Sequence, residues 1–156
     1  MLSIYYSGMI SQEIALLVPH RLLSLTLIVT HFGGATARAP LSGILSISYS
    51  LFGARTEDDQ IRAAMKTLYS QSTYHNNNKH RYDRLYQHHK KRIANRVKPT
   101  LGGILGHFQA VMTHHVPYHD LLKIRAAGYP ILIIVGTEDM LVNTQNSHIL
   151  HNIIGM

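Results

Sequence analysis

The chain of 156 residues contains no cysteine, and only 8 of its residues are acidic. Without cysteine the chain cannot have a disulfide framework, a thiolate metal site or a cysteine nucleophile. The sequence also lacks an apolar run long enough to span a membrane, and its first residues lack the basic segment of a secretory signal. These absences predict one globular domain in a reducing compartment, and we expect a cytoplasmic location.

The scarcity of acids leaves a net charge of +7 at pH 7, and this charge is local. Eight of the 15 Lys and Arg residues lie between Lys79 and Lys98, where Asp83 is the single acid. Three tyrosines lie in or beside the same stretch: Tyr74, Tyr82 and Tyr86. Such a segment can bind nucleic acid, through phosphate contacts and base stacking, or an anionic membrane surface. The solvated outer face of a helix is the simpler interpretation, so nucleic acid is not the expected partner.

Two apolar runs have the length and composition of buried β-strands. They cover residues 22–30 and 130–135, and both are rich in leucine, isoleucine and valine. Helical patterns flank both runs, and strands that helices cover on both faces lose the alternation of apolar and polar residues. The sequence therefore predicts two buried parallel strands.

Between Pro40 and Asp120 the sequence contains helical patterns only. The clearest helix follows Thr56, a capping residue with three acids directly after it. Apolar residues then recur at helical spacing, at Ile61, Ala64, Met65, Leu68 and Tyr69. Further helices are predicted near residues 9–17, 41–52, 82–93, 104–112 and 121–127, and one more after Asn143.

An acid lies just beyond the second strand. Asp139 follows Gly136, at the point where open α/β sheets carry their catalytic residues. From this spacing alone, a role in the turn or in capping the next helix is the simpler interpretation.

Two segments are similar to the α/β-hydrolase superfamily of serine hydrolases. Residues Gly8 to Ala15 resemble the helix after the nucleophile elbow, and residues Tyr129 to Asp139 resemble the strand that ends in the triad acid. By this resemblance Asp139 would be the triad acid, which holds the histidine that serves the nucleophile. With the resemblance in view, this role becomes the favoured interpretation of Asp139.

The resemblance also implies a fold. We expect an α/β protein with a partial α/β-hydrolase core, made of two parallel strands and their flanking helices. This core would comprise residues 1–32 and 121–156, and residues 33–120 would form an all-helical cap or lid.

The sequence departs from the family where the nucleophile belongs. The elbow pattern Gly-x-Ser-x-Gly falls on Ser3 to Gly8, which places Tyr5 at the nucleophile position and supplies neither elbow glycine. Shifting the frame to Ser7 does not restore the pattern. The family's catalytic histidine follows a further strand, which this chain lacks. We therefore expect a hydrolase truncated at both ends and catalytically inactive.

The function implied for the parent protein is hydrolysis of an ester, amide or related acyl bond. A Ser-His-Asp triad performs this reaction without a cofactor, and the partner of the parent would be a small acyl substrate. The alternative function is a non-catalytic binding protein that uses the basic cap helix, on nucleic acid or an anionic membrane surface. Because two strands leave both sheet edges open, we also expect self-association, which a monomeric and cooperatively melting sample would contradict.

The 12 histidines raise the question of a metal site. His115 and His119 have the i, i+4 spacing of a zinc pair, but Pro117 lies between them and no glutamate accompanies them. Other histidines cluster in the same half of the chain: His75, His80, His88, His89, His107 and His114. We predict no metal, and histidines that are solvated or line the cap.

Overall fold

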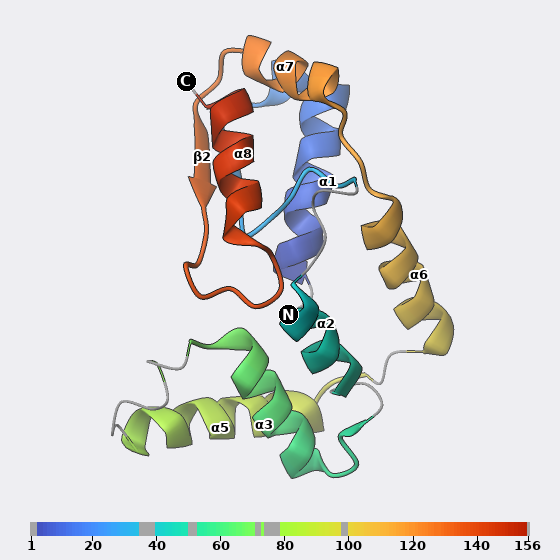
Figure 1. The fold of residues 1–156 in the computed structure, drawn as a ribbon, viewed down its shortest axis with the longest axis vertical. Coiled ribbons are helices and arrows are strands. Elements are labelled where there is room, and N and C mark those ends of the chain that lie inside the picture. Colours follow the sequence, from blue (N-terminus) through green and yellow to red (C-terminus); the bar gives the residue numbers. More distant parts are fainter. Residues whose placement is uncertain are drawn as a thin grey trace. The chain divides into compact units, whose positions relative to one another are not determined.

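The computed structural model describes residues 3–34, 40–49, 53–70, 73, 79–97 and 100–155, with side chains from residue 7 onward. These ranges form seven α-helices, one short 3-10 helix and two strands (Figure 1). The elements in order are α1 (Ser3–Leu17), η1 (Pro19–Arg21), β1 (Leu25–Ile28), α2 (Leu41–Ser48), α3 (Glu57–Leu68), α5 (Lys79–Ala94), α6 (Leu101–Thr113), α7 (Tyr118–Ala126), β2 (Ile131–Ile134) and α8 (Thr144–Ile154). No helix of the described ranges is both long and apolar enough to cross a membrane.

The strands pair in parallel, with Leu25 opposite Ile131 and Ile28 opposite Ile134. Both are shorter than the apolar runs that predicted them. The pairing of β1 ends at Val29, whose φ of 47° lies in the left-handed region. A β-branched residue rarely adopts this conformation, which turns the chain away from its partner strand.

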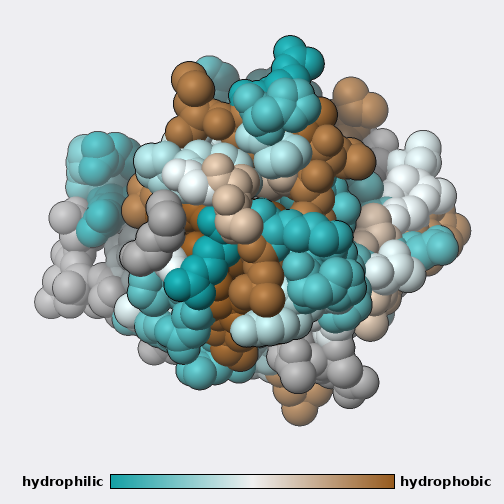
Figure 2. Space-filling view, turned by 90° about the horizontal axis from the view of Figure 1, so that it is seen from above, coloured by the Kyte–Doolittle hydropathy of each residue, from teal (hydrophilic) through white to brown (hydrophobic). Residues whose placement is uncertain are grey.

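Helices cover one face of the strand pair. Leu25 and Leu27 point into a core that α1, α7 and α8 share. The buried residues of this core are Ala15, Leu25, Leu27, Val116, Leu121, Ile124, Tyr129, Leu150 and Ile154. On the other face Ile28, Leu132 and Ile134 are 42%, 55% and 44% exposed. Figure 2 likewise shows hydrophobic side chains that reach the surface between hydrophilic ones.

The predicted α/β fold class, with a partial α/β-hydrolase core and a helical cap, is wrong. Within the described ranges the protein is mostly helical, and its two strands have four residues each. The expected burial of both strand faces also fails, because the helices pack on one face only. Long apolar runs indicate burial, but one ladder between short strands is too small to organise a layered sheet. The chain is a small helical protein that contains a short parallel strand pair.

The chain divides into two compact units. The first comprises residues 1–38, 100–137 and 142–156, and the second comprises residues 39–99 and 138–141. The first unit contains the strand pair with α1, α6, α7 and α8, and the second contains α2, α3 and α5. The predicted division, into residues 1–32 and 121–156 on one side and residues 33–120 on the other, has other limits than these two units. That division stays a prediction.

Two helices begin where the sequence predicted a cap, at Thr56 and at Asn143 or Thr144. Thr56 Oγ1 accepts a hydrogen bond from Asp59 N at 3.1 Å, and the Asp59 carboxylate accepts one from Thr56 N at 3.2 Å. This capping box satisfies donors that the first turn of α3 would otherwise leave unpaired. Asn143 caps α8 in a similar way, by accepting a hydrogen bond from Gln145 N at 3.0 Å. Both predicted helix starts are confirmed.

Candidate functional site

Asp139 lies in the second unit, in the short segment Glu138–Leu141 that follows β2 along the chain. Its side chain is half-buried, and Oδ1 accepts a hydrogen bond from Leu141 N at 2.7 Å. The segment packs closely on α2, because a Cβ at the buried Gly43 would overlap the carbonyl oxygen of Met140. The carboxylate therefore has a fixed place in a tight turn, a geometry that fits a role in the turn as well as the predicted role of a triad acid.

The residues aligned with the nucleophile elbow lie in α1. This helix begins at Ser3, so Tyr5 and Ser7 have helical backbone in place of a strand-to-helix turn. The side chains of Ser3 and Tyr5 lie outside the described residues. Ser7 is exposed, and its carbonyl oxygen accepts a hydrogen bond from Ser11 Oγ at 2.6 Å. The structure gives this segment the form of an ordinary helical turn.

The predicted histidines are spread over several elements. His115 pairs with Gly33 in an isolated bridge, whereas His119 lies in α7 with Nε2 3.4 Å from Asp120 Oδ1. His75 lies outside the described residues. Among the residues that the structure describes, no group of three or more His, Asp or Glu side chains could hold a metal ion. His115 and His119 therefore do not belong to a common metal site among the described residues.

A buried polar cluster in the first unit escaped the sequence analysis. It consists of Gln12 in α1, His31 after β1 and the side chain of His114 after α6, and we name it the histidine cluster. Gln12 Nε2 donates to the carbonyl oxygens of His31 and Gly8, at 3.0 and 3.2 Å. The two imidazole rings lie 6.0 Å apart between centroids. A glutamine in the middle of an amphipathic helix and a histidine at the end of an apolar run were the signals for this cluster.

Two atoms of the histidine cluster are buried without a hydrogen-bond partner, Gln12 Oε1 and His114 Nε2. Gly33 N donates to His31 Nδ1 at 3.0 Å, which fixes the orientation of that ring. Glu13 Oε1 lies 3.6 Å from His114 Nδ1. A carboxylate beside one ring nitrogen and an unpaired second nitrogen resemble the acid and base of a catalytic triad. No described hydroxyl bonds to His114, however, so the cluster lacks an activated nucleophile on this side.

Burial sets the charge of both histidines. Desolvation lowers the pKa of His31, and the neighbouring His114 lowers it further. Desolvation and then His115 lower the pKa of His114, while a hydrogen bond to the backbone of His31 acts in the opposite direction. Both rings are therefore neutral at pH 7, and the contact of His114 with Glu13 is a charge–dipole contact and not an ion pair.

We expect the free energy of unfolding to fall as the pH is lowered from about 7 toward 5. In the unfolded chain histidines take up protons near their ordinary pKa of about 6.5, whereas His31 and His114 in the fold resist protonation to lower pH. Between these values the unfolded state binds more protons, so stability that is present above about pH 6.5 is lost on acidification. Urea unfolding at several pH values measures the slope.

The double variant His31→Asn, His114→Gln tests the source of this pH dependence. It keeps polar atoms at both positions, and we expect its unfolding free energy to depend less on pH. The exposed His148→Gln serves as the control. An unchanged slope in the double variant, or an equal change in the control, would contradict the assignment to the histidine cluster.

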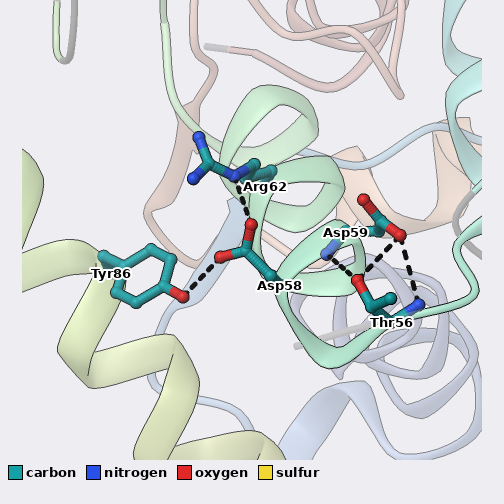
Figure 3. Close-up of polar contacts among 5 residues, drawn as sticks. All are labelled: Thr56, Asp58, Asp59, Arg62 and Tyr86. Atoms are coloured by element: carbon teal, nitrogen blue, oxygen red, sulfur yellow. Dashed lines mark hydrogen bonds and ion pairs between the residues drawn. The ribbon is translucent and has the colours of Figure 1, made fainter.

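The second unit holds the basic helix α5 against α3. Tyr86 Oη donates to Asp58 Oδ1 at 2.5 Å, and Arg62 Nε donates to Asp58 Oδ2 at 2.6 Å (Figure 3). The phenol first and then the guanidinium hold the pKa of Asp58 below its usual range, and the same contact raises the pKa of Tyr86. His89 of α5 is buried, and its Nε2 atom lies 3.2 Å from Tyr69 Oη. These contacts fix which side of α5 faces α3.

We also compared the chain with known protein families and with curated proteins. No protein-family model matches the chain, and no curated protein matches it with significance.

Proposed function

We propose that the chain is a segment related to serine hydrolases, in which Asp139 descends from the acid of a Ser-His-Asp triad. The whole protein would hydrolyse an ester, amide or related acyl bond of a small substrate, without a cofactor. The proposal assigns no α/β core to this chain, whose structure is mostly helical. A cytoplasmic location also belongs to the proposal, and cell fractionation tests it.

One observation carries the proposal: a half-buried aspartate follows a parallel strand whose partner strand follows a helix. The turn holds the Asp139 carboxylate through the N–H of Leu141 at 2.7 Å. A carboxylate that backbone keeps in place after a strand suits an acid that must orient a histidine. The sequence from Tyr129 to Asp139 supports the same assignment, since it is one of the two segments that resemble the family most strongly.

By itself the chain is not expected to hydrolyse acyl bonds. Tyr5 stands at the nucleophile position, and the segment around it is helical. A helical turn does not present a nucleophile beside two converging backbone N–H groups, which stabilise the oxyanion in acyl transfer. The loss of one such donor costs about 10²–10³ in kcat.

We expect no turnover of a p-nitrophenyl acyl ester above the rate of an inactive control protein. The variant Asp139→Asn keeps the size of the side chain and removes its charge, so it is the matched comparison. Equal rates for the two chains are the expected result. Ester turnover that Asp139→Asn abolishes would contradict the prediction of inactivity.

The relationship itself has a separate test in the genomic sequence that flanks the coding region. A strand with Gly-x-Ser-x-Gly upstream and a strand followed by a histidine downstream would support the proposal. Flanking sequence that encodes neither would contradict it.

A further inference from the structure

Helix α5 carries a concentrated positive charge that the proposed hydrolase relationship does not use. It contains six basic residues and a single acid, Asp83. The basic residues are Lys79, Arg81, Arg84, Lys90, Lys91 and Arg92. In the described part of the chain no carboxylate forms an ion pair with Arg84, Lys91 or Arg92. These charges are thus available to an external anion.

The contact with α3 orients this charge outward. Tyr82, Leu85, Tyr86, His89 and Ile93 are half-buried or buried and follow one side of α5 at helical spacing. Residues on the opposite side are exposed: His80, Arg84, Gln87, His88 and Lys91. At a rise of 1.5 Å per residue, Arg84 and Lys91 lie about 10 Å apart along the helix axis. The outer side of α5 is therefore a basic row with no apolar component.

Two aromatic rings lie on the side of α5 that faces α3, opposite this row. The rings of Tyr82 and Tyr86 have an interplanar angle of 21° and centroids 6.4 Å apart. The hydrogen bond to Asp58 anchors Tyr86, as Figure 3 shows, and Tyr82 lies one turn earlier on the same helix. The two tyrosines therefore belong to the contact with α3, and they leave the basic row on the opposite side of the helix.

We propose that the exposed cations of α5, Arg84 and Lys91 on the outer side with Arg92 next to Lys91, bind the phosphate backbone of single-stranded nucleic acid. The cations neutralise phosphates along the helix. The structure favours this ligand over an anionic membrane, because α5 exposes no large apolar side chain that could enter the interface. The sequence alone favoured a solvated helix face, and the structure adds the outward orientation of the charges and the lack of a described ion pair for Arg84, Lys91 and Arg92.

The test uses the whole chain and a fluorescently labelled oligothymidine of about 20 nucleotides, followed by anisotropy at several salt concentrations. The triple variant Arg84→Gln, Lys91→Gln, Arg92→Gln should bind more weakly. Its slope of log K against log salt should be smaller by about 2, since each phosphate contact on a single strand contributes about 0.7.

A control variant separates a site on α5 from the effect of net charge. Arg21→Gln, Lys123→Gln, Arg125→Gln removes the same three charges from exposed positions of the first unit, and it should bind like the parent chain. Circular dichroism checks that each variant is folded.

Three outcomes would overturn the proposal. They are no binding at about 50 mM salt, equal losses in the two triple variants, and binding to phosphatidylserine vesicles without binding to the oligonucleotide. Esterase activity, present or absent, leaves this result unaffected, so the two proposals fail independently.

Discussion

Replacing Leu27 with alanine is expected to lower the free energy of unfolding by about 2–5 kcal/mol. Leu27 is fully buried in the middle of β1 and belongs to the core that α1, α7 and α8 share. The shorter side chain loses its transfer free energy and leaves a cavity that rigid neighbours fill only in part. Urea denaturation followed by circular dichroism measures the loss.

Leu132→Ala is the matched control for this prediction. Leu132 lies on the neighbouring strand, but its side chain is 55% exposed on the open face. Surface substitutions of this kind usually change stability by about 0.5 kcal/mol or less. Similar losses in the two variants would mean that the faces of the strand pair are not distinguished as the structure describes.

This contrast between the two faces could not be predicted from the sequence. Leu25, Thr26, Leu27 and Ile28 form part of a continuous apolar run, and such a run predicts burial without saying on which side. Which face is covered depends on where α1 and α8 pack, and this is decided by contacts far apart in sequence. The predicted fold class failed because the described chain is mostly helical and its two strands have four residues each. The expected burial of both strand faces failed separately, because it assumed helices on both faces.

The local signals were more informative. Thr56 with three following acids predicted the start of α3, and the structure has the capping box there. Periodic apolar residues likewise predicted helices, since helical spacing depends on neighbours within two turns. The end of β1 could not be predicted. Val29 takes a left-handed conformation there, and nothing in the surrounding leucine-rich and isoleucine-rich sequence indicates it.

The candidate sites divide in the same way. The basic segment could be predicted from the sequence because its charges lie within one short stretch of the chain, which forms a single helix. The histidine cluster was not, since Gln12, His31 and His114 come from three separate parts of the chain. Their lowered histidine pKa values arise from burial, which is a property of the folded unit.

Gly33 lies at the centre of that cluster, and Gly33→Ala is expected to destabilise the chain by about 2–4 kcal/mol. Its φ of +84° lies in the left-handed region, which costs alanine about 1–2 kcal/mol. A Cβ at this position would also overlap the carbonyl oxygen of His114, which is backbone and cannot rotate away. Moving that segment would in turn disturb the bridge between Gly33 and His115.

Gly102→Ala provides a control with the opposite sign. Gly102 lies in α6, and no atom lies within 4 Å of the place where its Cβ would be. Alanine favours a helix over glycine by about 1 kcal/mol, so this variant should be more stable than the parent chain. Urea denaturation of the two variants side by side measures both effects. If Gly33→Ala were as stable as Gly102→Ala, the close approach of Gly33 to His114 would be disproved, and with it the packing that buries the histidine cluster.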